Sequence, residues 1–359
     1  MRLTSWKICA TVGPVKQVTQ KDIAKRLGVS ASLVSRALSG TGLGIGVSLK
    51  TIEWIRAEAA RLNYQPSAVA LSLRGAPTHT IGVVIKNFDD PFFGRIIAEL
   101  QTLAASRGLS LLLTGCAPGS GGHVDIRSLV KYRLDGLVIA GSDFIPDGLG
   151  EVLRGGQRVV RIGSGPKVAG VVNISVDMED GFRKLVSYLV QLGHRDIGYL
   201  GDETESSMRR GKLLEESLRS VGLVPRSQCF VRAVVAGAQA GYEAMQTMIR
   251  RCGDLLPTAV VAADDTLAQT ALRALFEHHI AVPQDLTLVG VDDVPAAQMM
   301  IPSLTTLRQP IPAMVRAAFE YLTETSKRKS VAAELLIRPE LVIRESAAAP
   351  IHRRDIHDG

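Results

Sequence analysis

The stretch V-T-Q-K-D-I-A-K-R-L-G-V-S-A-S-L-V-S-R-A-L-S, residues 18–39, decides the fold of the N-terminal part of the chain. Thr19, with Asp22 three residues later, is typical of a capped helix start. Gly28-Val29-Ser30 supplies a turn and a serine that can cap a second helix. Apolar residues recur at helical spacing on both sides of this turn. The stretch therefore predicts two short helices joined by a tight turn.

The second of these helices has two different faces. Its apolar face is formed by Val34, Ala37 and Leu38. The side chains expected to point outward are small, polar or basic: Ala31, Ser32, Ser35 and Arg36. A short helix with such an outer face suits the major groove of DNA. The alternative is an ordinary helical hairpin in a domain core.

Basic residues are concentrated around this stretch. Residues 1–78 contain eleven Lys and Arg against three acidic residues, although the formal net charge of the whole chain is +7. Lys and Arg beside a candidate reading helix neutralise DNA phosphates. The alternative is a basic face that only meets solvent.

Further segments complete the N-terminal part. A third helix is predicted from Ser48, with Ile52, Ile55, Ala59 and Leu62 at helical spacing, and Pro66 ends it. Residues 1–17 are expected to be a flexible lead. The glycine-rich segment 39–46 is expected to be a turn, because it matches no phosphate-loop pattern. A two-turn helix at 67–74 is too short to be stable alone and needs a partner.

From Thr80 onward, short apolar runs alternate with helical segments. One set has runs at 81–85, 109–113, 135–140 and 158–162, and we expect a loop from there to a helix at 179–192. A second set has runs at 196–201, near Phe230, at 258–263 and at 286–291. This pattern predicts an α/β fold of two doubly wound parallel-sheet subdomains with an N-terminal all-α helix-turn-helix domain. A ligand cleft is expected between the subdomains.

Several classes of protein are disfavoured by features that the sequence lacks. No apolar run approaches the ~20 residues of a membrane span, and the N-terminus lacks a convincing export signal. We therefore expect a cytoplasmic protein without a membrane partner. Cys9, Cys116, Cys229 and Cys252 show no zinc-ligand spacing, and neither does His278-His279. We expect no metal and no cofactor.

Longer motifs resemble the LacI/GalR family of transcription regulators over about residues 18–345. Besides 18–39, they include V-S-L-K-T from Val47, L-N-Y-Q-P-S-A-V-A-L-S-L from Leu62, D-P-F-F (90–93), D-G-L-V-I (135–139), V-D-M-E-D-G (176–181), L-G-H-R-D-I-G-Y-L-G (192–201), A-D-D-T-L-A (263–268), V-G-V-D-D (289–293) and P-S-L-T-T-L-R-Q (302–309). The resemblance implies a helix-turn-helix domain at 18–66 and a hinge helix with linker at 67–78. It implies a first core subdomain at 79–179 and 309–334, a second at 180–308 and 335–345, and a tail at 346–359.

The resemblance also implies which residues meet DNA. Ala31, Ser32 and Arg36 correspond to base-reading positions, and Arg36 can bond guanine through two hydrogen bonds. Thr19, Ser30 and Ser35 correspond to positions near phosphates, while Asn63 and Tyr64 close the module. Leu73 stands where the family wedges a leucine between base steps of the minor groove. Ile52 departs from the family pattern, which commonly has an Arg there, and the 39–47 loop is longer than typical.

For the ligand cleft, the resemblance points to residues of both subdomains: Asp90, Phe92, Phe93, Ser164, Arg210, Asp264 and Asp292. Carboxylates and Arg210 suit the hydroxyl groups of a sugar, and phenyl rings suit its apolar face. As alternatives, Asp264 or Asp292 could cap a helix, and at least one of the two phenylalanines could belong to the core. Asp265 is interpreted as a helix-start cap. Leu213 and Ala236 depart from the family pattern.

The predicted function is that of an allosteric repressor. A homodimer would bind a near-palindromic double-stranded DNA operator, and a sugar-like small molecule in the cleft would alter its affinity as an inducer or as a corepressor. Two alternatives stay open: a solute-binding protein without DNA function and a cytoplasmic α/β enzyme. The adjacent pairs Asp264-Asp265 and Asp292-Asp293 resemble acid/base pairs, but adjacent side chains diverge and no nucleophile accompanies them. We expect no catalytic residue.

Overall fold

The structure, a computed structural model, describes residues 18–39, 46–64, 77–116, 123–235, 237–323 and 334–350. They belong to two compact units, Met1–Ala76 and Pro77–Gly359, and each unit is described by itself. Several predictions lie outside the described residues: the lead at 1–17, most of the 39–46 loop, most of the hinge segment with Leu73, Ala236 and the end of the tail.

The first unit contains the three predicted helices, α1 (Gln20–Leu27), α2 (Ala31–Leu38) and α3 (Leu49–Arg61). The start of α1 is a capping box, in which the Asp22 carboxylate accepts a hydrogen bond of 2.8 Å from the Thr19 N–H and Thr19 Oγ1 accepts one from the Asp22 N–H. Gly28 ends α1 at φ 66°, a conformation that glycine adopts readily. Ile23, Val34 and Ile55 are fully buried between the helices. The helix-turn-helix prediction is confirmed.

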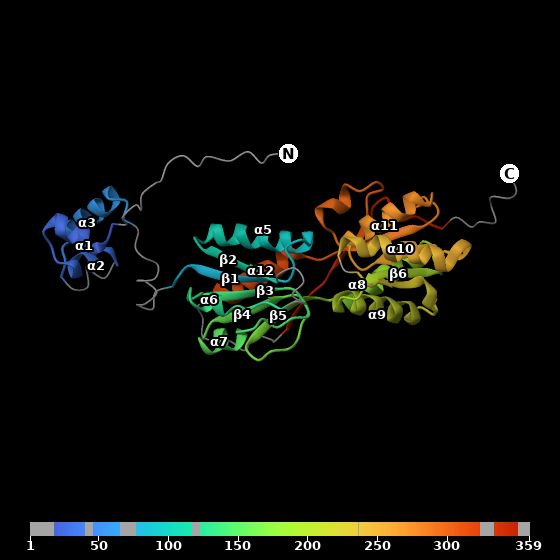
Figure 1. The fold of residues 1–359 in the computed structure, drawn as a ribbon, viewed down its shortest axis with the longest axis horizontal. Coiled ribbons are helices and arrows are strands. Elements are labelled where there is room, and N and C mark those ends of the chain that lie inside the picture. Colours follow the sequence, from blue (N-terminus) through green and yellow to red (C-terminus); the bar gives the residue numbers. More distant parts are fainter. Residues whose placement is uncertain are drawn as a thin grey trace, which may run out of the picture. The chain divides into compact units, whose positions relative to one another are not determined.

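The first subdomain of the second unit is a six-stranded parallel sheet with the spatial order β11-β5-β4-β3-β1-β2. Its strands are β1 (Thr80–Ile85), β2 (Ser110–Gly115), β3 (Gly136–Ala140), β4 (Arg158–Ile162), β5 (Val171–Val176) and β11 (Glu334–Ile337). Helices α5 (Pro91–Ser106) and α12 (Ile311–Thr323) cover one face, and α6 (Arg127–Val130) and α7 (Leu149–Arg154) cover the other (Figure 1).

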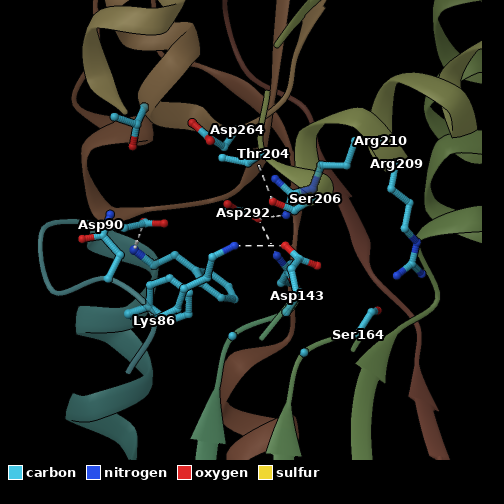
Figure 2. Close-up of a pocket in the computed structure, with 18 of the residues that line it drawn as sticks. Lys86, Asp90, Asp143, Ser164, Thr204, Ser206, Arg209, Arg210, Asp264 and Asp292 are labelled. Atoms are coloured by element: carbon cyan, nitrogen blue, oxygen red, sulfur yellow. Dashed lines mark hydrogen bonds and ion pairs between the residues drawn. The ribbon is translucent and has the colours of Figure 1, made fainter. Parts of the chain in front are cut away.

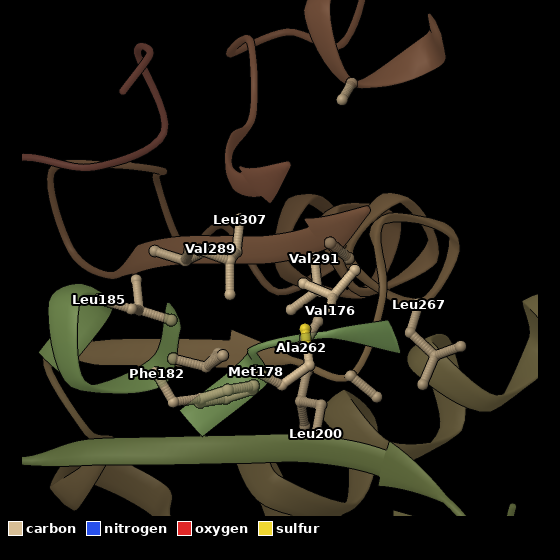
Figure 3. Packing of buried hydrophobic residues seen from close by; sticks show 14 of the residues in the cluster. Val176, Met178, Phe182, Leu185, Leu200, Ala262, Leu267, Val289, Val291 and Leu307 are labelled. Atoms are coloured by element: carbon tan, nitrogen blue, oxygen red, sulfur yellow. The ribbon is translucent and has the colours of Figure 1, made fainter. Parts of the chain in front are cut away.

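The second subdomain repeats this order with β12-β10-β9-β8-β6-β7. Its strands are β6 (Ile197–Asp202), β7 (Phe230–Ala233), β8 (Ala259–Ala262), β9 (Thr287–Asp292), β10 (Thr305–Arg308) and the antiparallel β12 (Glu340–Val342). Helices α8 (Met178–Gln191) and α9 (Glu205–Ser220) pack together, as do α10 (Ala238–Cys252) and α11 (Asp265–Glu277). Short 3-10 helices lie at Ser227–Cys229, Gly253–Leu255 and Pro295–Gln298. Figure 3 shows Phe182 and Leu185 of α8 beside Val289 of the sheet in this core.

Both sheets have the same topological switch point. In the first sheet β1 lies between β2 and β3, and in the second β6 lies between β7 and β8, so the connections from these strands leave in opposite directions. Ligands of open parallel sheets bind outside the carboxyl ends of strands at such a point. The chain passes between subdomains after β5, after β10 and after β11. The predicted fold class is confirmed.

Three details differ from the sequence-based expectations. Residues Val171–Val176 form β5 where we expected a loop; all six are buried, so no alternation of polar and apolar residues marks the strand. Strand β11 pairs with β5 in the first sheet, although residues from 335 onward were assigned to the second subdomain. Ser346 was expected in the tail but is buried, and its hydroxyl donates a hydrogen bond of 2.6 Å to the Leu288 carbonyl. Contacts of one serine with backbone carbonyls leave no periodic signal in a sequence.

Candidate DNA-binding surface and ligand cleft

The outer face of α2 carries the residues predicted to read bases. Ala31, Ser32 and Arg36 are exposed, and the Arg36 guanidinium has neither a hydrogen bond nor an ion pair to any residue that the structure describes. Ser30 caps α2 by accepting a hydrogen bond of 3.2 Å from the Leu33 N–H. The prediction that Ser35 points outward is wrong, because its exposed fraction is 8%. Both α1 and α3 contact α2, so the buried face of this short helix is wider than its apolar residues indicate.

The other predicted DNA-contacting residues of this unit lie near helix ends. Thr19 is exposed at the start of α1, where its hydroxyl also donates to the Asp22 carboxylate at 2.6 Å. Asn63 is exposed and has φ 49°, a left-handed conformation that asparagine tolerates after a helix. Tyr64 is partly buried against the helical core. The structure thus gives Asn63 and Tyr64 a role in ending α3.

Exposed basic residues lie on the two helices that contact α2. Exposed cations without a described partner include Lys21, Lys25, Lys50 and Arg56. Arg61 instead bonds Glu58 through both Nε and Nη2, each at 2.8 Å. Ile52, which stands at a position commonly Arg in the family, is 5% exposed and belongs to the core. In this chain the position therefore contributes an apolar core contact and no positive charge.

A cavity of about 330 Å³ lies between the two α/β subdomains, at the carboxyl ends of their strands. Its walls contain all seven residues predicted for the ligand cleft: Asp90, Phe92, Phe93, Ser164, Arg210, Asp264 and Asp292. The first four come from loops and a helix start of the first subdomain, and the others come from the second (Figure 2). Residues separated by about 200 positions in sequence are therefore brought to one site by the two switch points.

Arg210 and Asp292 form the centre of the second-subdomain wall. Arg210 Nη2 donates to Asp292 Oδ1 at 3.0 Å, and Arg210 Nη1 donates to the Ala263 carbonyl. The same Asp292 oxygen accepts a hydrogen bond from Gln309, which lies on the chain passing back to the first subdomain. The pair is largely buried, with side-chain exposures of 16% and 6%. These bonds fix the guanidinium and the carboxylate in place before a ligand arrives.

The backbone beneath this wall is held in an unusual conformation. Asp292 and Asp293 have φ 108° and 53°, values that non-glycine residues rarely adopt. Asp293 is bound on both oxygens, by Arg308 at 2.7 Å and by Arg344 at 2.6 Å. Asp265 accepts hydrogen bonds from the Thr306 hydroxyl at 2.6 Å and the Val294 N–H at 2.8 Å. Asp265 therefore braces the loop after β9 and is not the helix cap that the sequence suggested.

Asp90 and Asp264 cap helices and face the cavity at the same time. Asp264 accepts from the Leu267 N–H at 2.8 Å to cap α11, and Asp90 accepts from the Phe92 N–H at 2.9 Å to cap α5. Burial and the nearby Asp292 carboxylate raise the pKa of Asp264 to about 7. The same two causes raise the pKa of Asp90 above its ordinary value. Asp264 therefore has both of the roles considered from the sequence: it caps a helix and it lines the cleft.

The apolar residues that line the cavity include Phe92, Phe93 and Leu213. The two rings meet edge to face, with centroids 5.3 Å apart. Phe93 is 6% exposed and belongs to the core, whereas Phe92 is only partly buried. Phe92 is therefore the ring with surface available to a ligand.

Sequence reasoning missed several polar residues of the cavity wall. Lys86 and Asp143 form an ion pair of 3.0 Å, and Thr204, Ser206, Arg209 and Gln309 also line the space. Lys86 directly follows β1 and Asp143 follows β3 by three positions. A search of the residues just after each buried strand would have found this pair, because ligands sit at carboxyl strand ends.

Neither a metal-ion site nor a membrane-spanning helix is found among the described residues. Among these residues, no group of three or more His, Cys, Asp and Glu is arranged to hold a metal ion. Within the same ranges, no helix has the length and apolar character to cross a membrane.

Comparison with known proteins agrees with both parts of the architecture. A family model described as periplasmic binding protein-like domain matches residues 186–347. The HTH-type transcriptional repressor PurR of Pectobacterium atrosepticum is 31% identical over 339 residues, which cover 92% of this chain and 97% of that protein. PurR of Erwinia tasmaniensis is likewise 31% identical over 92% of this chain and 97% of its own length. The chain belongs to the LacI family of transcription regulators.

Solved structures of this family share the fold. The Lac repressor dimer bound to operator and the anti-inducer ONPF superimposes with a TM-score of 0.78 and 27% identity, covering 93% of this chain and 100% of that chain. A complex of the transcriptional regulator CelR with cellobiose has a TM-score of 0.61 at 24% identity over 92% of this chain and 100% of that chain, which shows the fold alone. The protein is a DNA-binding transcriptional repressor of this family and not an enzyme.

Proposed function

We propose that this repressor binds a near-palindromic operator as a homodimer in the cytoplasm, and that a sugar or sugar derivative in the cleft changes its operator affinity. The observation that carries the proposal is the cavity of about 330 Å³ whose polar walls come from two subdomains of a chain that also has a helix-turn-helix unit. A ligand that touches both walls stabilises one arrangement of the subdomains over another, which is the requirement for a population shift.

The DNA-reading part of the proposal rests on α2. Arg36 supplies two parallel donors for a guanine, Ser32 supplies a hydroxyl, and Ala31 can contact a thymine methyl. Thr19 and Ser30 are both exposed and, in this proposal, contact phosphates, while the exposed cations of this unit add affinity without sequence preference. The homodimer is proposed by analogy with the Lac repressor, whose similar structure is a dimer bound to operator. The minor-groove wedge at Leu73 stays a prediction.

The ligand part rests on the chemistry of the cleft. Asp90, Asp264 and Asp292 present carboxylate oxygens, and Arg210 presents guanidinium donors. These groups suit vicinal hydroxyl groups, which both donate and accept hydrogen bonds. The exposed side of Phe92 suits an apolar sugar face.

The operator test compares two exposed arginines of the first unit. Operator sequences are selected from a random DNA library, and affinities are measured by fluorescence anisotropy at fixed salt. Arg36→Ala is expected to weaken operator binding roughly tenfold or more per half-site and to leave nonspecific DNA binding nearly unchanged. Arg56→Ala, on α3, is the matched control and should change both affinities alike. Equal losses of operator affinity in the two variants would refute the assignment of α2 as the base-reading helix.

The ligand test is a thermal-shift screen against sugars, polyols, sugar phosphates and nucleobases. Each hit is then added to the operator-binding assay. A hit should change operator affinity and should lose its effect in Arg210→Met. A hit that binds the wild type and Arg210→Met equally well would place the ligand elsewhere.

A further inference from the structure

We propose that the effector carries an anionic group, a phosphate or a carboxylate, which binds at the Ser164 end of the cleft between Arg209 and the loop Gly163–Gly165. The inference rests on the proposed function, because it names the chemical class of the ligand for the same cleft. It is carried by two guanidinium groups on either side of this loop that no described carboxylate neutralises.

Arg209 is the first of these groups. It lines the cavity from α9, is exposed, and has neither a hydrogen bond nor an ion pair to any residue within the described ranges. In Figure 2 its guanidinium extends from the second subdomain toward Ser164 of the first. The Ser164 hydroxyl also lacks a described partner, so it is available to donate a hydrogen bond. A free arginine opposite a free hydroxyl is suited to an oxyanion, because guanidinium bonds phosphate and carboxylate through paired donors.

Arg161 is the second group, and it lies behind the loop. It is fully buried at the end of β4, and none of its three guanidinium nitrogens has a hydrogen-bond partner in the described structure. A Cβ atom at Gly165 would lie 1.9 Å from Arg161 Nη1, so the guanidinium rests directly against the Gly165 backbone. A buried charge without a partner is costly. Because the Arg161 guanidinium lies against Gly165, its positive potential acts on the loop that forms the cavity wall.

The neighbouring carboxylate does not neutralise Arg161 through a bond. Asp143 is the acidic residue whose charge acts on Arg161, but it is bound by Lys86 at 3.0 Å. Burial lowers the pKa of Arg161 and Asp143 opposes this effect, yet an arginine stays charged in proteins. An anion on the loop would supply the missing negative charge.

The loop itself is held in position from below. Ser175 donates a hydrogen bond of 3.2 Å to the Gly163 carbonyl, and Asn173 donates one of 3.4 Å to the Gly165 carbonyl. Asn173 lies directly opposite Arg161 in the parallel pairing of β4 with β5. These bonds turn two carbonyl oxygens toward the sheet, where they cannot repel an anion in the cleft.

Acidic residues occupy the other end of the cavity. In Figure 2, Asp90 and Asp264 lie on the side away from Arg209, with Asp292 between. Burial and Asp292 raise the pKa values of both Asp90 and Asp264, so this end already repels negative charge. A ligand with hydroxyl groups at one end and an anionic group at the other matches both ends. A hexose phosphate or an aldonate has this arrangement.

The test uses the full chain and matched ligands: D-glucose, glucose 6-phosphate, gluconate and inorganic phosphate, with the corresponding set repeated for galactose. Affinities are measured by calorimetry at constant ionic strength. At least one anionic member should bind tenfold or more tightly than its neutral parent. The comparison of phosphate with carboxylate members identifies which anion the loop prefers. Anionic members that bind no tighter than their neutral parents, or do not bind, would overturn the proposal.

Two variants assign the effect to the loop. Arg209→Gln should weaken the anionic ligand roughly tenfold, because a charge-assisted hydrogen bond is lost, and should leave the neutral parent unchanged. Arg219→Gln, an exposed arginine on the same helix that pairs with Glu215 away from the cavity wall, is the control and should change neither affinity. Equal affinities in these two variants would contradict the role of Arg209.

Arg161→Met separates an electrostatic role from a structural one. Removing an unpaired buried charge should leave the melting temperature unchanged or raise it, while affinity for the anionic ligand falls. A lower melting temperature with unchanged anion affinity would show that Arg161 only supports the fold. If a neutral sugar alone binds and shifts operator affinity, the proposed function holds and this inference fails. If an anionic ligand binds but operator affinity does not respond, this inference holds and the switch fails.

Discussion

The two α/β subdomains share a strand order but hold their charged residues in opposite ways. In the second subdomain, Asp265, Asp292 and Asp293 are each bonded by at least two described partners at the carboxyl edge of the sheet. At the carboxyl edge of the first sheet, Lys86 forms an ion pair with Asp143. Beside it, the fully buried Arg161 has no hydrogen-bond partner among the described residues. The same topology therefore supports a bonded cluster of buried aspartates at one wall and an unbonded buried arginine beside the other.

The difference in bonding means that the two walls of the cavity would respond differently to a ligand. The bonded aspartates of the second subdomain keep two residues at positive φ, a conformation that costs of order 1–3 kcal/mol per residue when unsupported. That wall is preorganised, so little ordering is needed on binding. The unpaired cation of the first subdomain is a destabilising feature that a ligand can relieve. Substitutions that touch each wall test this contrast.

Asp265→Ala should have the largest effect on stability. It would leave the buried Thr306 hydroxyl and the Val294 N–H without their acceptor. Two unsatisfied buried donors cost about 4 kcal/mol together in free energy of unfolding. Urea unfolding, monitored by far-UV circular dichroism, measures this loss of unfolding free energy. Glu320→Ala, an exposed acid on α12, should change stability by less than about 0.5 kcal/mol, and a similar change in both variants would refute the bracing role.

The two ion pairs of the cavity wall provide the next comparison. Arg210→Met leaves the Asp292 carboxylate, whose exposed fraction is 6%, without its cation, and should cost about 3 kcal/mol. Lys86→Met breaks a pair with exposures of 26% and 14% and should cost about 1 kcal/mol. Both variants are measured by urea unfolding at one pH. A larger loss for Lys86→Met would reverse the contrast between the walls.

The raised pKa of Asp264 predicts a pH dependence of stability. Its pKa is about 7 in the folded protein against 3.8 for an ordinary aspartate, so the folded state holds a proton that the unfolded state has released. Stability from this group is therefore present at low pH and lost as pH rises from about 4 to about 7, by about 2 kcal/mol after allowing for its partial exposure. Asp264→Asn retains a helix cap and should flatten this slope. Parallel pH profiles of the two proteins would argue against a perturbed Asp264.

The sequence predicted the subdomains and most of the cavity because both leave periodic or positional signals. Buried strands appear as apolar runs, and Asp90, Arg210 and Asp292 lie in motifs of a recognisable family. Ser35 and Asp265 were misinterpreted because burial of a small or acidic side chain depends on what another element presents. Arg161 gave no signal at all: an arginine within R-V-V-R-I looks like the polar position of a half-exposed strand. Only the fold shows that Gly165 covers it.

The smallest effect is expected at the rim of the bonded wall. Arg308 bonds two acids, the largely buried Asp293 at 2.7 Å and the exposed Glu340 at 3.0 Å. Glu340 is 69% exposed, so water screens its charge and ordering its side chain offsets much of the attraction. Glu340→Gln should lower the free energy of unfolding by no more than about 0.5 kcal/mol, and less in high salt. A loss comparable to that of Arg210→Met would mean that the second wall depends on its surface charges, and the contrast between a buried, bonded wall and an open one would no longer hold.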